Sequence, residues 1–159
     1  MIKIKFITVG KIKEKSLKTI IDEYLKRLTR YAKIESVELN DLPVPENPSE
    51  SEIASVLEKE GAEILKHISA RACIVTLCIE GKKFSSEQFA HFLEKTHNEY
   101  SELIFVVGSS HGLSDKVKNI SNLKISMSDM TFPHNLAKLM LAEQIYRAFK
   151  INNNENYHK

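Results

Sequence analysis

Two largely apolar runs constrain the fold of this chain more than any other feature. They cover residues 72–79 and 103–107, and β-branched residues are frequent in both. Such runs are typical of strands buried on both faces, which occur in parallel sheets. Segments with helical spacing of apolar residues lie between the predicted strands. Because parallel strands need crossover connections of this kind, the sequence predicts an α/β fold with a mainly parallel sheet flanked by helices.

The rest of the chain alternates in the same way. Ser49 and Glu52 have the spacing of a capping box at a helix start, and Gly81 is expected to turn the chain after the 72–79 strand. Three prolines between 40 and 48 predict a loop. The patterns predict further strands over 2–9, 33–39 and 123–127, and helices over 16–31, from 49 to about 68, from 85 or 86 to about 100, over 114–119, and after Pro133 to 151.

The segment from Ser126 to Ile151 combines a polar loop with a long helical pattern. The loop follows a predicted strand and leads to Pro133, a residue that suits a helix start. Backbone N–H groups in such a loop are free to meet a ligand. We therefore expect the helix to be structural and the loop to be functional. One broad apolar face of the helix would be formed by Leu136, Leu139, Met140, Ile145, Ala148 and Phe149.

Composition limits the class of protein. A chain of 159 residues with 42% hydrophobic and 28% charged residues suits one soluble domain. A formal net charge of +2 does not indicate a nucleic-acid binder, and the basic residues concentrated in the first 33 positions suit a solvated helix face. The first ten residues are too short for a signal peptide or membrane span. We expect a cytoplasmic protein with no membrane segment.

The cysteines and histidines do not suggest a metal site. Cys73 and Cys78 lie five residues apart in one predicted strand, so their side chains point to opposite faces and do not readily form a disulfide. Buried free thiols in a reducing compartment follow from this. The six histidines show no metal-ligand spacing. No structural metal is expected.

Three loops follow predicted buried strands: the turn after Leu77, the loop at Gly108, and residues 127–132. Because ligands of parallel sheets bind outside the carboxyl ends of the strands, we expect the three loops to form one pocket. The Gly108 loop matches neither GxGxxG nor the P-loop, so an ordinary tight turn stays open beside a ligand loop. The residues alone lead to a nucleotide-like ligand.

Several polar residues have both a functional and a structural interpretation. Ser128, Asp129 and Thr131 precede a helix and suit capping as well as ligand binding. Arg147 lies four residues after Glu143, so it suits a surface ion pair or a contact to phosphate or RNA. The terminal Tyr157, His158 and Lys159 offer a stacking ring, an imidazole and a cation, although chain termini are commonly disordered. No nucleophile-base pair or carboxylate pair is indicated by spacing.

An ordered set of short motifs goes further than any single one. In this order the set resembles the RlmH family of SPOUT-class methyltransferases, which modify a pseudouridine in large-subunit ribosomal RNA. The likeness covers essentially the whole chain and is most specific in its last third. The motifs are Ile4 to Gly10; Val75-Thr76-Leu77 followed by Gly81-Lys82; Phe105-Val106-Val107-Gly108 with Gly112-Leu113; Thr131-Phe132-Pro133-His134; Glu143-Gln144-Ile145-Tyr146-Arg147-Ala148; and Tyr157-His158-Lys159.

The resemblance implies a single SPOUT domain over residues 1–159 that forms a homodimer. A C-terminal trefoil knot and the site for S-adenosylmethionine would lie within about 72–151, followed by a tail over 152–159. Knots are rare, and periodicity alone would not suggest one. Carried over by matching motif, the cofactor site would use Leu77, Gly108, Met127, Ser128, Asp129, Met130, Thr131 and Phe132.

The resemblance also implies a reaction, methylation of the ring N(3) of a pseudouridine in 23S ribosomal RNA within the assembled ribosome. His158 is the candidate base or orienting group, Tyr157 a stacking or hydrogen-bonding group, and Arg147 a contact to phosphate or base, with Asp129 as a second candidate base. The family usually has a second glycine after Gly108, where this chain has Ser109, which does not freely adopt a positive φ.

Two other functions stay open from the sequence. A ribosome-associated binding or assembly factor would keep the fold without the chemistry, and Ser109 is the feature in its favour. A nucleotide-binding protein of flavodoxin-like architecture would need an anion-binding loop after the first strand, and residues 10–13 match one poorly.

Overall fold

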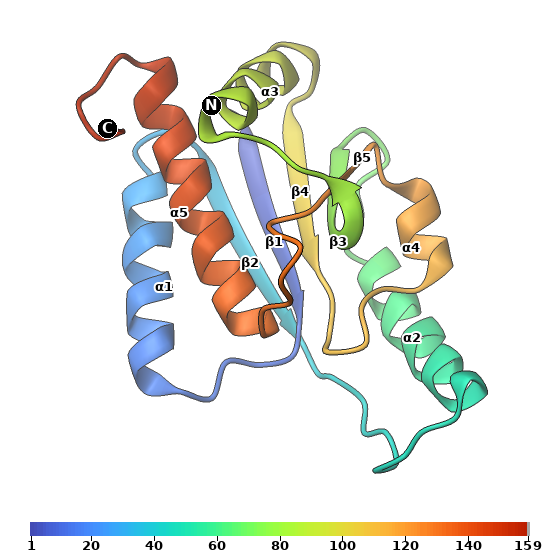
Figure 1. Cartoon of the computed structure of the whole chain (residues 1–159). Helices are drawn as coiled ribbons and strands as arrows, with labels where there is room; N and C mark the ends of the chain where they lie inside the picture. The colour runs from blue at the N-terminus through green and yellow to red at the C-terminus, as the bar shows by residue number, and fades with distance from the viewer. Residues whose placement is uncertain (159) are drawn as a thin grey trace.

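A five-stranded sheet forms the centre of the computed structural model, which describes residues 1–158. Every neighbouring pair of strands is parallel. The spatial order is β2-β1-β4-β3-β5 (Figure 1). The strands are β1 (Lys3–Val9), β2 (Lys33–Leu39), β3 (Cys73–Lys82), β4 (Glu102–Val107) and β5 (Leu123–Ile125).

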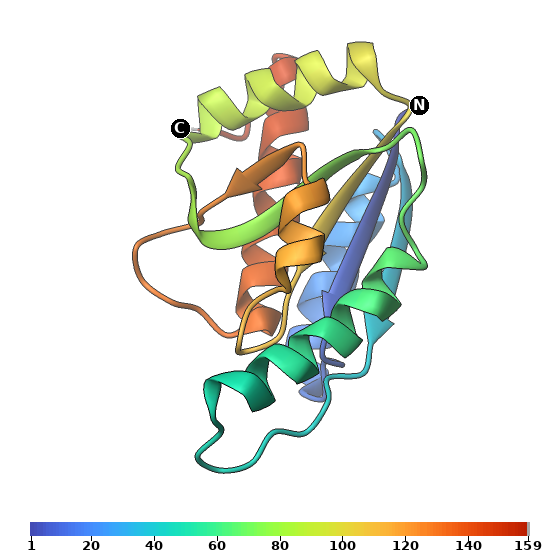
Figure 2. The same cartoon turned by 90° about the vertical axis from the view of Figure 1, so that its right-hand side faces the viewer.

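Helices cover both faces of this sheet, as Figures 1 and 2 show. One face carries α1 (Lys15–Leu28), α3 (Ser86–Glu99) and α5 (His134–Asn152). The other face carries α2 (Glu50–Leu65) and the short α4 (Asp115–Ile120). The predicted α/β fold, with a parallel sheet flanked by helices, is confirmed. Among residues 1–158, no helix is long and apolar enough to cross a membrane.

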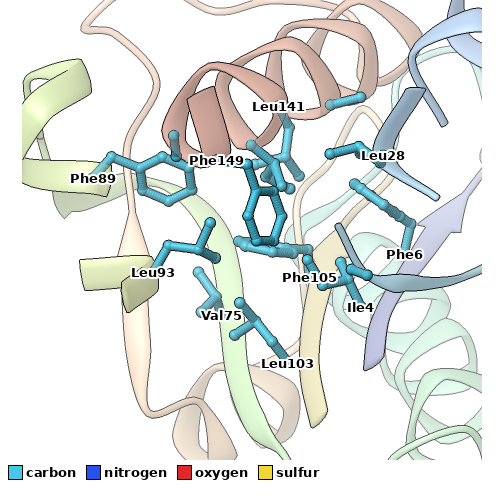
Figure 3. Close-up of a cluster of buried hydrophobic side chains, with 14 of the residues drawn as sticks. Ile4, Phe6, Leu28, Val75, Phe89, Leu93, Leu103, Phe105, Leu141 and Phe149 are labelled. Carbon is cyan, nitrogen blue, oxygen red and sulfur yellow. The ribbon is translucent and has the colours of Figure 1, made fainter. Parts of the chain in front are cut away.

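The larger core lies between the sheet and α1, α3 and α5. Phe6 of β1 and Phe105 of β4 stack with ring centroids 6.0 Å apart, and Figure 3 shows Leu141 and Phe149 of α5 directed into the same cluster. Burying such side chains contributes about 1.5–3 kcal/mol each. The central strands and α5 therefore depend on one another for their position.

The smaller core lies on the opposite face, under α2 and α4. Cys78 belongs to this core whereas Cys73 belongs to the larger one. Both thiols are free and buried, and burial raises the pKa of each. The prediction that the two cysteines face opposite ways without a disulfide is confirmed.

The predicted helix starts agree with the structure in detail. Ser49 caps α2, accepting from the N–H of Glu52, while the Glu52 carboxylate accepts from the N–H of Ser49. Ser85 and Gln88 form the same arrangement at α3. Three elements end earlier than predicted, since α1 stops at Leu28, α2 at Leu65 and β5 at Ile125.

The prediction that Gly81 turns the chain is wrong. Strand β3 continues to Lys82, with an irregularity between Leu77 and Lys82, both of which pair with Ile125. A Cβ at Gly81 would lie 2.5 Å from the carbonyl carbon of Ile125. The glycine is therefore needed for the close approach of β5 to the end of β3.

The predicted apolar face of α5 is only half right. Ile145, Ala148 and Phe149 are buried as expected, but Leu136, Leu139 and Met140 are only partly buried, and the last two line an open hollow. Lys138 takes a buried place instead, donating to Ser36 Oγ at 2.9 Å. Three helices share this face of the sheet. Helix α5 therefore packs against α1 and α3 as well as against the strands.

The strand order bears on the flavodoxin-like alternative. A flavodoxin-like sheet has the order 2-1-3-4-5, whereas here β3 lies between β4 and β5. That alternative is wrong. The trefoil knot, and the division of the domain at about 72–151 with a tail from 152, stay predictions.

Candidate active site

The loop after β5 connects the sheet to α5 and has its own internal structure. The N–H of Ser126 donates to the carbonyl of Lys82 at 2.9 Å, which joins the loop to the end of β3. Ser126 Oγ donates to the carbonyl of Ser128 at 3.0 Å, and the N–H of Met130 donates to Ser128 Oγ at 3.0 Å. Within residues 1–158, the N–H groups of Ser128, Asp129, Thr131 and Phe132 make no hydrogen bond. Internal hydrogen bonds thus hold the conformation of the loop, while most of its backbone N–H groups remain available to a ligand.

A small hollow of about 100 Å³ lies between this loop and the bend in β3. Its walls include six of the predicted cofactor residues, while Asp129 points elsewhere and pairs with Lys83 at 2.5 Å. The side chain of Asp129 is 82% exposed. The six residues are Leu77, Met127, Ser128, Met130, Thr131 and Phe132.

Gly108 leaves the sheet at the same edge but does not line this hollow. A Cβ at Gly108 would lie 2.4 Å from the carbonyl oxygen of Gly112, so the loop closes tightly on itself. The positive φ falls at Gly112, at 90°, and Ser109 has a negative φ. The expected pocket of three loops is thus formed by two of them, and Ser109 is not strained.

A larger hollow of about 590 Å³ adjoins the small one. The two share Ile125, Ser126 and Met127 as a common wall. From there the larger hollow extends to Glu143 and Gln144 of α5 and to Ser86 at the start of α3, where Ser86 Oγ donates to Gln144 Oε1 at 2.8 Å. Its apolar lining comes from α1, α3, α5 and the connection before α3: Ile20, Tyr24, Phe84, Phe89, Leu139, Met140 and Leu141.

The C-terminal tail is folded back against α5 rather than extended. Asn154 has a φ of 53°, and the N–H of Glu155 donates to the carbonyl of Lys150 at 2.9 Å. The Glu155 carboxylate accepts from Tyr31 Oη at 2.9 Å and pairs with Lys150 at 2.5 Å. This reversal directs the following residues along α5. Lys159 of the predicted tail lies outside the described residues.

The three predicted catalytic residues are brought together by this reversal. Arg147 Nη1 lies 3.1 Å from His158 Nδ1, and its guanidinium lies over the Tyr157 ring, 4.9 Å from the centroid. Tyr157 Oη donates to Glu143 Oε1 at 3.1 Å. Arg147 also pairs with Glu143 at 2.6 Å, so the ion pair predicted from their spacing is present together with the contact to the tail.

The electrostatics of this cluster favour a charged arginine and a neutral phenol. The Glu143 carboxylate raises the pKa of Arg147 above its usual value. Burial, supported by Tyr24 and Glu143, raises the pKa of Tyr157 to about 12. At neutral pH, Tyr157 is therefore a hydrogen-bond donor and Arg147 carries a positive charge.

Glu87 of α3 is a member of this cluster that the sequence did not indicate. Its Oε1 lies 2.7 Å from His158 Nε2. The two residues are 71 positions apart, and no spacing rule connects them. Within residues 1–158, no group of three or more His, Cys, Asp or Glu side chains is placed to hold a metal ion.

Comparison with known proteins decides the family. The family model described as "Predicted SPOUT methyltransferase" matches residues 2–158. The chain belongs to the SPOUT methyltransferase family. This SPOUT methyltransferase is 52% identical over 158 residues to the Ribosomal RNA large subunit methyltransferase H of Streptococcus thermophilus, with 99% of each chain covered. The protein of the same name from Streptococcus pneumoniae is 51% identical over the same share of each chain.

Family membership gives the two adjoining hollows a chemical context. A methyltransferase has to hold a methyl donor and an acceptor next to each other. In this SPOUT methyltransferase the loop after β5 forms a wall of both hollows, and the polar cluster of Glu143, Arg147, Tyr157 and His158 begins at the rim of the larger one.

Proposed function

We propose that this protein methylates large-subunit ribosomal RNA, and that the methyl group passes from S-adenosylmethionine to the ring N(3) of a pseudouridine in 23S RNA. The relatives named above, which are half identical over their full length, support the RNA class. The finer assignment to pseudouridine and N(3) follows the motif resemblance.

The observation that carries the proposal is the shared wall of the two hollows. Ile125, Ser126 and Met127 separate a site lined by the predicted cofactor residues from a larger one that extends to Glu143. Holding two reactants on either side of one short segment supplies the alignment that a displacement needs.

The chemistry of the residues present suits the methyl donor, while the hollow of about 100 Å³ takes only part of a molecule of that size. Leu77, Met127 and Phe132 give apolar surfaces for an adenine ring, while the free N–H groups of the 128–132 loop are donors for its edge or for a carboxylate. When bound, S-adenosylmethionine supplies an electrophilic methyl group on a sulfonium. Gly108, whose loop ends at the same edge of the sheet, completes the proposed set together with Ser128, Asp129, Met130 and Thr131.

The acceptor N(3) carries an imide proton that has to be removed or balanced. His158 is the proposed base or orienting group, because its imidazole lies in the cluster next to Arg147. Arg147 offers N–H donors to a phosphate or to the developing anion of the base. Tyr157 is held neutral and offers a ring for stacking. Asp129, which is paired with Lys83, is the second candidate base.

We further propose that the protein acts as a homodimer on the assembled ribosome in the cytoplasm. Part of the apolar lining of the larger hollow is open to solvent, since Ile20 is 45% exposed and Leu139 and Met140 are half-buried, which suits contact with a second copy. A net charge of +2 gives a single subunit little attraction for bare RNA, so ribosomal shape and dimerisation have to add to affinity. The binding-factor alternative loses its support, because Ser109 is accommodated without strain.

Methyl incorporation tests the proposal directly. Ribosomes purified from a strain lacking the enzyme are incubated with labelled S-adenosylmethionine and the protein, and the modified nucleoside is mapped. A methylated pseudouridine in large-subunit RNA is the expected result. Cofactor binding without incorporation would favour the non-catalytic binding factor or another RNA substrate. Tight, site-specific methylation of protein-free RNA would contradict the requirement for the ribosome.

A further inference from the structure

His158 is held between two helices by one contact at each ring nitrogen. Its Nε2 lies 2.7 Å from Oε1 of Glu87 on α3, and its Nδ1 lies 3.1 Å from Nη1 of Arg147 on α5. The side chain of His158 is 29% exposed and that of Glu87 is 63% exposed. Both contacts are reachable from solvent, so a substrate can meet the imidazole without the core opening.

These two contacts determine where the imidazole carries its hydrogen. A guanidinium has only N–H donors, so Nδ1 of His158 has to accept from Arg147 through its lone pair. A neutral imidazole with a lone pair on Nδ1 carries its hydrogen on Nε2. That hydrogen points to the Glu87 carboxylate, which accepts it. The arrangement therefore selects one tautomer.

Glu87 is suited to this task by its position in α3. It lies in the first turn, directly after Ser86 and the Ser85 cap, where the helix dipole favours a negative charge. Its own backbone N–H and then His158 hold the pKa of Glu87 below its usual value. The carboxylate is thus an ionised acceptor at neutral pH, and no rearrangement of α3 is needed to present it.

We propose that Glu87 is a positioning residue of the methylation site, which fixes His158 in the Nε2–H tautomer with Nδ1 directed at Arg147. The proposal rests on the proposed function and selects the orienting role for His158, because the lone pair on its Nδ1 already accepts from Arg147. Ser86, the neighbour of Glu87, lines the larger hollow. Glu87 thereby connects the tail to the helix start that borders the proposed acceptor site.

A tautomer measurement tests the pairing without any methylation. Long-range proton–nitrogen NMR of the uniformly labelled protein reports which ring nitrogen carries the lone pair, and a His158→Asn variant assigns the signal. We expect the Nε2–H form in the wild type, a mixture of both tautomers in Glu87→Ala, and recovery of the Nε2–H form in Glu87→Gln, whose amide oxygen can still accept. The Nδ1–H form in the wild type, or identical tautomer ratios in all three proteins, would overturn the proposal.

Kinetics with ribosomes test the consequence for the reaction. An exposed charged contact of this kind changes an equilibrium constant by a factor of a few. Glu87→Ala should therefore lower kcat about two- to fivefold, while KM for S-adenosylmethionine stays unchanged. Glu94→Ala is the matched control, because Glu94 is an exposed glutamate of the same helix and, among the described residues, makes no hydrogen bond or ion pair with His158. Equal kcat for wild type and Glu87→Ala would overturn the positioning role. An inactive wild type would instead reject the proposed function, while the NMR result would still show whether the pair forms.

Discussion

The hydroxyl of Ser109 donates to Oε1 of Glu60 at 2.8 Å, across a sequence separation of 49 residues. The other oxygen of the same carboxylate accepts from the N–H of Leu42 at 3.0 Å. Glu60 is 4% exposed. One buried side chain of α2 therefore joins the Gly108 loop to the proline-containing loop over 40–48.

Replacing Ser109 should weaken the fold through this carboxylate. In Ser109→Ala, one buried oxygen of Glu60 loses its donor, which costs roughly 1–3 kcal/mol of the free energy of unfolding. Urea unfolding measures the loss. Ser110→Ala is the control, because the neighbouring side chain is exposed. Equal stabilities of the two variants would show that the Ser109 contact contributes nothing.

Adding a methyl group at Gly81 should disturb β5. The new Cβ would lie 2.5 Å from the Ile125 backbone, which cannot move aside as a flexible side chain does. We expect Gly81→Ala to cost about 1–3 kcal/mol by overpacking. Thermal unfolding tests this, with Ile79→Ala as the comparison, since Ile79 is 65% exposed. A stability loss no greater than that of Ile79→Ala would contradict the close approach.

The pH dependence of stability should report the buried amine of Lys138. Burial lowers the pKa of Lys138 in the folded protein, while in the unfolded chain it stays near 10.4. Between these two pKa values the unfolded state binds more protons, so the free energy of unfolding rises with pH. The contribution of Lys138 is least favourable below the folded pKa.

Lys138→Met isolates this effect, because methionine keeps much of the volume and does not titrate. We expect the stability of the wild type relative to Lys138→Met to increase as the pH rises toward 10, measured by urea unfolding at a series of pH values. A relative stability that stays constant or falls over this range would be incompatible with a buried, destabilised charge.

Removal of the tail should separate cofactor binding from methylation. A chain ending at Asn156 lacks Tyr157 and His158 but keeps the 127–132 loop, so calorimetry should give nearly unchanged affinity for S-adenosylmethionine. Methyl incorporation into ribosomes should be abolished. Unchanged turnover of the shortened chain would remove His158 and Tyr157 from the site.

Much of the fold could be predicted from local sequence patterns, because the features concerned depend on residues that are neighbours in the sequence. The capping boxes at Ser49 and Ser85 and the buried runs of β3 and β4 all follow from residues within a few positions of one another. The same holds for the ion pair of Glu143 with Arg147, which lie one helical turn apart. The family resemblance added the tail, which residue patterns alone did not favour.

Contacts between residues far apart in the sequence could not be predicted from such patterns. Gly81 was taken for a turn because the strand that lies against it, β5, is more than 40 positions later. The pairs of Glu87 with His158 and Glu60 with Ser109 likewise join distant segments. Lys138 stands at a position on α5 that becomes buried only when α1 and β2 are in place. Three-dimensional packing decides these cases.

The central position of α5 has a consequence for how the protein is made. Phe6 and Phe105 belong to strands that precede α5 in the chain, and their cluster is completed only by Leu141 and Phe149 of that helix (Figure 3). Because chains are synthesised from the N-terminus, this core stays open until α5 has been made. A protein proposed to modify ribosomes thus completes its own core only after α5 has emerged from the ribosome that makes it.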